Sequence, residues 1–304
     1  MRVAITGATG FVGRAVARAL AERGDEVIAF TRDPEAAAER LDAEVVAVRW
    51  DPDDSVGIAA GLAGVSAVVN LAGEPVFGAR WSEARKERIR ASRVDGTRAL
   101  VQAMAQMDER PAVLVSASAV GYYGVSGIAE LAEEAPCGSD FLAAVCRDWE
   151  LEARRADALG VRTAVLRIGV VLGKEGGALP KMLLPFKLFV GGPIGDGAQW
   201  VSWIHLDDLV GLVLFAIDRS EVSGVLNATA PHPVTNGELS ETLGHVLGRP
   251  SWLPAPRAGV ELAFGEAATV VLDGQRAVPK RALELGYVFR FTEPDAALRA
   301  ILAR

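Results

Sequence analysis

The chain is short of several residue types, and each shortage excludes a class of protein. Its two cysteines, Cys137 and Cys146, and three dispersed histidines make no zinc pattern, so we predict no metal site and reduced thiols. No apolar run reaches the about 20 residues of a membrane-spanning helix, and the first residues have no signal-peptide core. The 32 basic residues are outnumbered by 39 acidic ones, a balance that does not favour nucleic-acid binding. We therefore expect a cytoplasmic protein that binds neither membranes nor nucleic acid.

One stretch is richer in positive charge than the rest. Its arginines and lysine recur at helical spacing and are interrupted by Glu83 and Glu87. Two interpretations stay open at this point. The stretch is a solvated helix face, or some of its side chains, Arg93 especially, face an anionic cofactor or substrate. The basic residues are Arg80, Arg85, Lys86, Arg88, Arg90, Arg93 and Arg98.

Half of the 304 residues are hydrophobic, and along the first 170 or so they alternate between two patterns. Short β-branched runs predict buried strands, and longer runs with helical periodicity lie between them. The predicted strands are Arg2–Thr6, Glu26–Phe30, Val45–Val48, Ala67–Leu71, Ala112–Ser116 and Arg162–Ile168. The predicted helices are Phe11–Arg23, Ser82–Met107, Phe141–Leu159 and Leu206–Ile217.

This alternation predicts an α/β fold with a doubly wound parallel sheet of the Rossmann type. After about Leu172 the pattern gives way to glycine- and proline-rich segments, which predict a smaller C-terminal substrate lobe. We place the nucleotide-binding domain at residues 1–225, with 173–200 contributing to the substrate cleft. The smaller domain then covers residues 226–304.

A glycine-rich loop follows the first predicted strand and opens the first predicted helix. Its G-x-x-G-x-x-G spacing allows a tight turn, a close backbone approach to a pyrophosphate, and close packing of the helix on the sheet. The helix N-terminus adds partial positive charge. A merely tight turn is the alternative. The predicted cofactor-binding residues here are Thr6, Gly7, Thr9, Gly10, Phe11, Val12 and Gly13.

The residue after the second strand predicts the choice of cofactor. Sites for NAD usually place an acidic residue there to bind the ribose 2′-hydroxyl, whereas this chain has Thr31 and Arg32. A guanidinium can pair with a 2′-phosphate, so we predict NADP(H), although the neighbouring Asp33 counts against it. An ordinary surface arginine is the alternative.

Two further segments end at the same edge of the sheet. Asp51 follows the third strand and is a candidate for adenine contact or a simple turn residue. Leu71, Ala72 and Gly73 follow the fourth strand, and we expect them over the nicotinamide-side ribose because ligands bind at the carboxyl ends of such strands.

Several runs together resemble the extended branch of the short-chain dehydrogenase/reductase superfamily. A narrower likeness, over essentially the whole chain, is to its atypical epimerase-like NAD(P)-dependent oxidoreductases with a C-terminal domain of unknown function. The runs include Thr6–Gly13, Asn70–Gly73, Arg93–Thr97, Ser118–Gly124, Arg147–Glu150, Leu166-Arg167, Ser202–His205, Asn227–Pro231, Pro233–Asn236, Gln275-Arg276 and Pro279-Lys280.

The resemblance also exposes a departure from superfamily chemistry. Superfamily enzymes use Tyr-x-x-x-Lys, in which the lysine cation lowers the pKa of the tyrosine. Phe141 takes the tyrosine position here and Val145 the lysine position. Neither side chain can transfer a proton, so ordinary epimerase or dehydrogenase chemistry is in doubt.

Other hydroxyl groups are candidates for the chemistry. Ser118 falls near the superfamily's catalytic serine, and Tyr122 and Tyr123 follow it in a glycine-flanked turn. One tyrosine could donate a proton during reduction, or both could be aromatic packing under the nicotinamide. The Arg93 guanidinium, near an asparagine position of the epimerases, is a candidate cofactor contact within reach of Ser118 or the tyrosine turn.

The C-terminal half offers weaker candidates. Lys181, Gln199, Trp200 and Trp203 are candidates to line the substrate cleft. His205 is expected to hydrogen-bond backbone, with contact to the substrate as the alternative. We therefore predict an NADP(H)-dependent oxidoreductase or epimerase-like enzyme acting on a small polar substrate. The alternative is a non-catalytic NADP(H) sensor or scaffold. A homodimer is left open.

Overall fold

The computed structural model describes residues 1–42 and 44–303, and a seven-stranded parallel sheet forms its centre. In spatial order its strands are β11 (Gly224–Ala228), β7 (Arg162–Ile168), β5 (Val113–Ala119), β4 (Ala67–Asn70), β1 (Arg2–Thr6), β2 (Glu26–Thr31) and β3 (Val45–Arg49). The order reverses direction beside β1, because β2 and β3 follow on one side and β4 and β5 on the other. Such a reversal opens a crevice at the carboxyl ends of the strands, where ligands bind.

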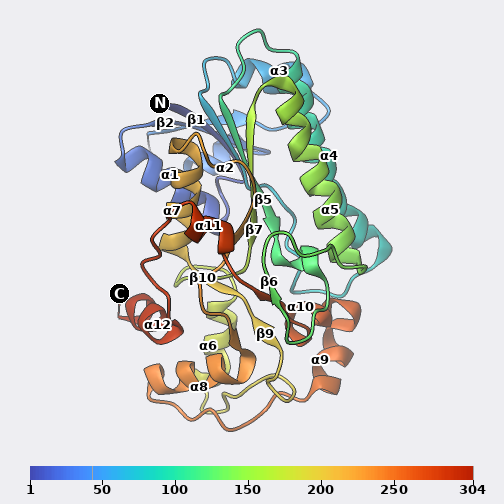
Figure 1. Cartoon of the computed structure of the whole chain (residues 1–304), viewed down its shortest axis with the longest axis vertical. Coiled ribbons are helices and arrows are strands. Elements are labelled where there is room, and N and C mark those ends of the chain that lie inside the picture. Colours follow the sequence, from blue (N-terminus) through green and yellow to red (C-terminus); the bar gives the residue numbers. More distant parts are fainter. Residues whose placement is uncertain (43, 304) are drawn as a thin grey trace.

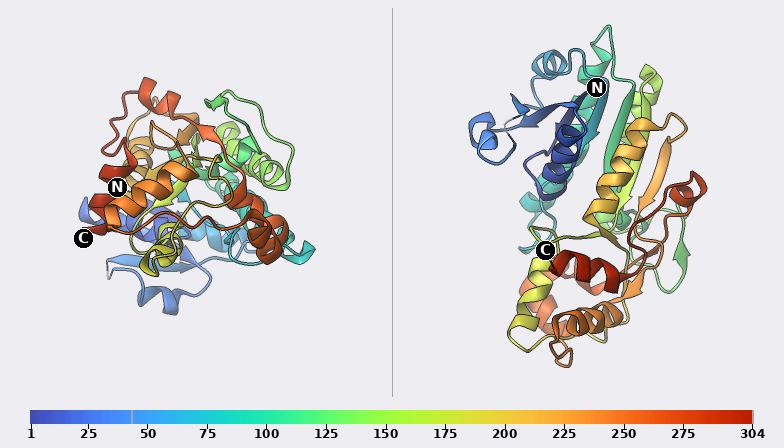
Figure 2. Two further views of the ribbon diagram at one scale, coloured as in Figure 1. Left: turned by 90° about the horizontal axis from the view of Figure 1, so that it is seen from below. Right: turned by 90° about the vertical axis from the view of Figure 1, so that its left-hand side faces the viewer.

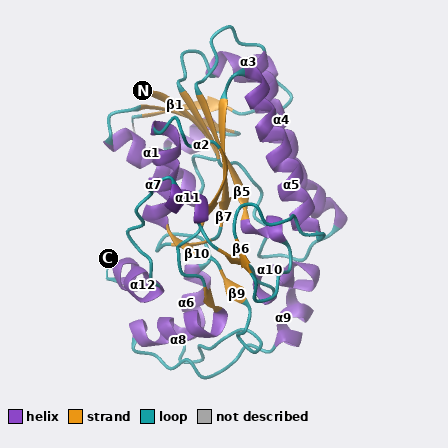
Figure 3. Ribbon diagram, in the orientation of Figure 1, coloured by secondary structure: helices purple, strands orange, loops and turns teal. Residues whose placement is uncertain are grey.

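Helices cover both faces of this sheet (Figures 1 and 3). One face carries α1 (Phe11–Glu22) and α7 (Leu206–Asp218), and the other carries α3 (Ser55–Gly61), α4 (Glu83–Ala105) and α5 (Phe141–Arg154). The short α2 (Pro34–Ala38) connects β2 to β3. Two 3-10 helices, η1 (Val120–Tyr123) and η2 (Arg155–Leu159), follow β5 and α5.

Alternation along each strand explains the two layers. Val3 and Ile5 of β1 pack into the core beneath α1 and α7, whereas Ala4, between them, packs into the core beneath α3 and α4. Successive side chains of a strand point to opposite faces, so a strand that is apolar throughout must be covered on both. The doubly wound arrangement predicted from the sequence is therefore confirmed.

The remaining elements form a smaller layer below the sheet (Figure 2, right). Its helices are α6 (Leu179–Lys187), α8 (Asn236–Leu247), α9 (Arg257–Phe264), η3 (Gly265–Ala268), α10 (Thr269–Leu272) and α12 (Pro294–Leu302), while α11 (Lys280–Glu284) lies against β11. Short strand pairs link them: β10 (Trp203–His205) with β8 (Val170–Leu172), β12 (Val234–Thr235) with β9 (Trp200–Val201), and β13 (Arg276–Ala277) with β6 (Glu130–Leu131). A third hydrophobic core, around Trp203 and Phe186, holds this layer together.

Most predicted strand and helix bounds lie within two residues of those in the structure, and β5 and α5 differ by more. β5 runs on to Ala119, because β7 pairs with it in register as far as Ile168. α5 ends at Arg154, where the chain tightens into η2. The domain boundary predicted at residue 225 falls inside β11, and the division itself stays a prediction. None of the helices described is long and apolar enough to cross a membrane.

Candidate cofactor and active site

The glycine loop adopts a shape that larger residues could not. Gly7 has a φ of +71°, and a Cβ there would lie 2.8 Å from the Leu71 carbonyl group. A Cβ on Gly13 would lie 2.1 Å from the Gly7 oxygen. Gly10 precedes α1 in an extended conformation, and no side chain caps the helix. The first N–H groups of α1 therefore remain available to a ligand, as a pyrophosphate cradle requires.

A groove of about 940 Å³ runs along the carboxyl ends of the strands beside this loop. Several residues that the sequence predicted for the cofactor line it: Thr6, Gly7, Thr9, Gly10, Arg32, Leu71, Ala72 and Gly73. Five others do not line it: Phe11, Val12, Gly13, Asp51 and Arg93. The groove is long enough to pass from β2 across β1 to the loop after β4, which is the path a dinucleotide takes in this fold.

Thr6 shapes the groove from below. Its hydroxyl donates to Asn70 Oδ1 at 2.7 Å and accepts the N–H groups of Leu71 and Ala72 at 3.2 Å. Asn70 in turn donates to Thr97 and Ser116 at 2.8 and 3.2 Å. The loop after β4 is thus fixed to the end of β1 by buried hydrogen bonds.

The predicted residues outside the groove have other contacts. The Phe11 ring packs against the glycines of residues 173–177, where a Cβ on Gly176 would lie 2.6 Å from it. Asp51 accepts the Asp53 N–H at 3.1 Å and so closes a turn, while Asp53 and Trp50 line the groove. Cofactor contact by Phe11, Val12, Gly13 and Asp51 stays a prediction.

Arg93 lies behind the groove wall that Gly73 forms. A Cβ on Gly73 would lie 3.0 Å from the guanidinium carbon, which also lies 5.4 Å from the Trp149 ring. One guanidinium nitrogen donates to the Ile89 carbonyl at 3.1 Å. Burial lowers the pKa of Arg93, partly offset by Glu74, and no carboxylate of the described residues lies within ion-pair distance. Among the described residues, Arg93 forms no hydrogen bond with Ser118 or with the tyrosine turn, and another arginine contacts that turn.

That arginine is Arg167 of β7, the centre of a buried polar network. Its guanidinium makes two hydrogen bonds to Glu150, at 2.8 and 2.9 Å, and a third to the Tyr123 hydroxyl at 3.0 Å. Ser118 donates to the same Glu150 carboxylate at 2.7 Å. Although burial acts in the opposite direction, hydrogen bonds and attraction to Glu150 raise the pKa of Arg167. The centre of the network is therefore a buried ion pair between Arg167 and Glu150.

The two tyrosines of η1 differ in their surroundings. The Tyr123 hydroxyl is buried and bonds Asn227 Oδ1 at 2.7 Å, and burial raises its pKa despite the nearby Arg167. The Tyr122 ring lies under the Arg167 guanidinium, 3.3 Å from ring centre to guanidinium carbon. Among the described residues, nothing hydrogen-bonds its hydroxyl. Tyr122 is thus the tyrosine whose proton is not already committed to the protein.

The positions of the superfamily pair are occupied by apolar side chains in α5. Phe141 begins the helix and contacts Trp81, with 5.3 Å between ring centres. Val145, one turn later, is buried. The sequence missed the network that lies one turn further along, although Glu150 and Arg167 both stand in runs that carried the family resemblance. Nothing in either run alone shows that the two side chains meet.

The candidates of the lower layer make mainly structural contacts. Trp203 is fully buried and donates to the His232 carbonyl at 2.9 Å. Gln199 donates to Ile194 and Val271. His205 accepts the Asp207 N–H at 3.0 Å, as expected for a residue that caps α7. Lys181 lies over the Phe77 ring, with 5.3 Å from Nζ to the ring centre.

The sheet order, the glycine loop and the groove together define an α/β dinucleotide-binding protein of the extended short-chain dehydrogenase/reductase type. Residues 3–228 match the NAD dependent epimerase/dehydratase family, and residues 255–301 match a Domain of unknown function (DUF1731). The chain belongs to this epimerase/dehydratase family and has the C-terminal domain that the sequence resemblance implied.

Its relatives are similar over almost their whole length. Epimerase family protein SDR39U1 of Homo sapiens is 40% identical over 100% of both chains. The chloroplastic SDR39U1 homolog of Arabidopsis thaliana is 45% identical over 99% of this chain and 87% of the relative. A crystal structure of human SDR39U1 (isoform2) with NADPH has a TM-score of 0.89 and 38% identity, covering 100% of this chain and 99% of that chain.

Proposed function

We propose that the protein binds NADP(H) and acts as an oxidoreductase or epimerase-like enzyme on a small polar substrate. The groove beside the glycine loop carries this proposal, because Gly7 and Gly13 leave backbone space that any Cβ would fill. Arg32 lines the end of the groove where the second strand stops. The human relative whose structure contains NADPH supports the same cofactor.

NADPH would supply the hydride. The side chains of this protein would bind the cofactor and donate a proton to the substrate. The α1 N-terminus would hold the pyrophosphate, and the loop Leu71–Gly73 would cover the nicotinamide-side ribose. Behind that loop, Arg93 is the cation nearest to Gly73 and stays in the proposal as a cofactor contact. We assign proton donation to Tyr122. Ser118 and Tyr123 belong to the hydrogen-bond network of Arg167, whose guanidinium stacks on the Tyr122 ring.

Calorimetric titration with NADPH and NADH tests the cofactor. Arg32→Asp should weaken NADPH binding by at least about tenfold more than NADH binding, because a carboxylate repels the 2′-phosphate. Gly10→Glu should abolish binding of both, since it puts bulk and negative charge at the pyrophosphate. If Arg32→Asp lost equal affinity for NADPH and NADH, the arginine would not select the phosphate.

A metabolite panel tests the activity, with consumption of NADPH followed by its absorbance. Turnover of a carbonyl-bearing polar substrate would support the enzyme. Absence of turnover across a broad panel, with NADPH shown to be bound, would count against it.

A second candidate function is a non-catalytic NADP(H) sensor or scaffold. The observation that favours it is the apolar pair Phe141 and Val145, together with the commitment of the Ser118 and Tyr123 hydroxyls to protein partners. Capturing partners with and without NADPH tests it. Identical partner sets in the two samples would remove the sensing role.

The proposal includes a cytoplasmic location, in keeping with the free thiols of Cys137 and Cys146. A homodimer is the assembly to test, by sedimentation at several protein concentrations.

A further inference from the structure

One end of the groove, the chamber, is lined by the end of β2 and by α2 with the turn that follows it. Two arginines and two alanines contribute to this lining. The residues of this chamber are Thr31, Arg32, Asp33, Ala36, Ala37 and Arg40.

Local structure returns the chain to the groove at Arg40. Asp33 caps α2 by accepting the Ala36 N–H at 3.1 Å, and Pro34 occupies its first turn. The helix is short, and its last turn closes when the Arg40 N–H donates to the Ala37 carbonyl at 3.0 Å. The chain therefore leaves β2 at Arg32, makes little more than one turn, and returns to the same groove at Arg40.

The chamber carries an excess of positive charge, which favours binding of an anion. Neither Arg32 nor Arg40 forms an ion pair with any described residue, and both are exposed. The Asp33 carboxylate is engaged as the helix cap, which reduces the objection that the sequence raised. Asp42, two residues beyond Arg40, pairs instead with Arg18 at 3.7 Å.

We propose that Arg40 is a second specificity residue, which with Arg32 encloses the 2′-phosphate of the adenosine ribose. The inference rests on the proposed binding of NADP(H) and names a determinant of its selectivity. A phosphate dianion accepts charge-assisted hydrogen bonds from guanidinium groups, whereas the neutral 2′-hydroxyl of NAD(H) gains little from two cations. The groove-lining residues between the two arginines in the sequence include Ala36 and Ala37, whose side chains are small.

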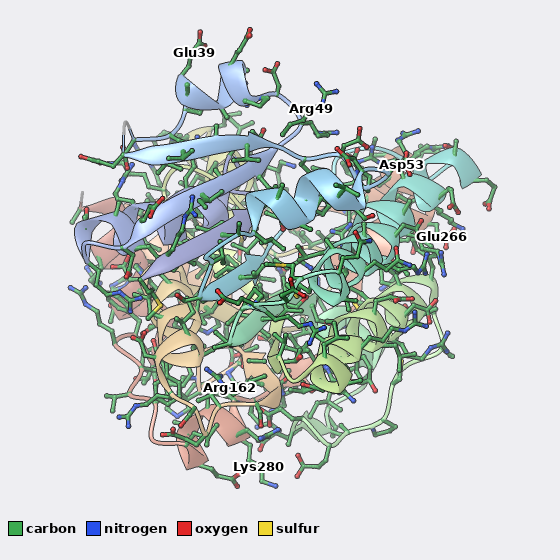
Figure 4. All side chains as sticks on the ribbon, turned by 90° about the horizontal axis from the view of Figure 1, so that it is seen from above. Glu39, Arg49, Asp53, Arg162, Glu266 and Lys280 are labelled. Carbon is green, nitrogen blue, oxygen red and sulfur yellow. The ribbon has the colours of Figure 1, made fainter. Side chains whose placement is uncertain are left out.

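The chain offers a matched control in Arg49. It ends β3 in register with Thr31 and is exposed, but it does not line the groove. Figure 4 shows Arg49 on the same side of the molecule as Glu39 at the end of α2. Removing Arg49 takes away one positive charge from this edge without touching the chamber.

The experiment compares wild type, Arg40→Ala and Arg49→Ala by calorimetric titration. The ligands are NADPH, NADH, adenosine 2′,5′-bisphosphate and AMP, so that the phosphate is tested with and without the nicotinamide half. Arg40→Ala should weaken the binding of NADPH and of the bisphosphate by about tenfold or more. The affinities for NADH and AMP should change little. Arg49→Ala should leave all four within about twofold, because exposed charges outside the site are screened. Thermal unfolding checks that each variant folds.

Three results would overturn the inference. Arg40→Ala could lose equal affinity for NADPH and NADH, Arg49→Ala could lose as much NADPH affinity as Arg40→Ala, or neither variant could lose any affinity. If wild type binds NADPH normally in those cases, only the role of Arg40 fails. If wild type binds neither cofactor, the proposed function fails with it. Asp33→Asn gives an independent check, because it keeps the helix cap and removes a negative charge; it should tighten NADPH and leave NADH unchanged.

Discussion

The guanidinium of Arg167 occupies a buried position that a cation can hold only with full pairing. Its bidentate contact with Glu150, at 2.8 and 2.9 Å, and its bond to Tyr123 satisfy the charge. Removing one partner of such a pair leaves a buried charge uncompensated, which costs far more than the intact pair gains. At the residue scale, this network fixes η1, and therefore both tyrosines, beneath the carboxyl ends of β5 and β7.

The two tyrosines should respond differently to loss of the hydroxyl. Tyr123→Phe leaves Asn227 and Arg167 each short of a buried partner, so we expect a loss of about 1–3 kcal/mol in the free energy of unfolding. Tyr122→Phe should change stability by less than about 0.5 kcal/mol, as a group with no internal partner. Urea unfolding measures both. Once a substrate is known, Tyr122→Phe should lower kcat about a hundredfold or more; an unchanged kcat would reassign the proton donor.

Glu133 gives stability a pH dependence of defined sign. Burial raises its pKa above the ordinary 4.5, although the N–H groups of Asn227 and Arg281 act against this. Because the folded state holds the proton more tightly than the unfolded chain, this group's contribution is full below pH 4.5 and is lost as the pH rises through the folded pKa. The difference in unfolding free energy between wild type and Glu133→Gln should therefore fall with rising pH over that window. A difference that is flat or rises with pH would contradict it.

At the scale of elements, the turn from β1 into α1 depends on missing side chains. The loop after β4 and the first turn of α1 both approach the backbone of Gly7 closely. The same closeness that admits a pyrophosphate also packs the helix on the sheet, so binding and folding depend on the same glycines.

Gly13→Ala should therefore damage both properties. Its Cβ would lie 2.1 Å from the Gly7 oxygen, which must shift, and we expect a loss of about 1–3 kcal/mol in stability with strongly reduced NADPH binding. Gly259→Ala in exposed α9 is the control, because its Cβ meets open space. It should gain about 0.5–1 kcal/mol and bind NADPH normally. Unfolding curves and calorimetry measure the pair, and normal NADPH binding by Gly13→Ala would contradict the close-packing argument.

At the scale of the whole molecule, the start of α4 and the loop before it join the sheet domain to the lower layer. Arg80 donates to the carbonyls of Leu262 and Ala263, Lys86 pairs with Glu266, and the Phe77 and Phe264 rings lie 4.7 Å apart. These contacts hold α9 and η3 against the start of α4 and the loop before it.

Removing these links should loosen α9 without affecting the nucleotide groove. In a double variant, Arg80→Ala with Lys86→Ala, amides of residues 257–268 should exchange hydrogen faster, while NADPH affinity stays within about twofold. Global stability should change by less than about 1 kcal/mol, because the ion pair lies near the surface. Arg88→Ala, exposed on the same helix, is the control. Unchanged exchange in α9 would show that the lower layer is held by other contacts.

The sequence by itself determined the sheet, its alternation with helices and the glycine loop, because each depends on residues that are neighbours in the chain. Strand periodicity, helix periodicity and the G-x-x-G-x-x-G spacing are local patterns. β1, α1 and the turn between them therefore follow from one continuous run of the chain, from Arg2 to Glu22. The apolar replacements Phe141 and Val145 were also visible, since a helix puts positions four apart on one face.

Only the tertiary structure decided the rest. Arg167 meets Ser118, Glu150 and Tyr123 because β5, β7 and α5 pack together, and no spacing in the sequence encodes that meeting. The strand pairs of the lower layer were equally hidden, since they join residues as distant as Glu130 and Arg276. Two-residue strands carry too little periodicity to be recognised, and they form because the surrounding core brings their backbones within hydrogen-bond distance.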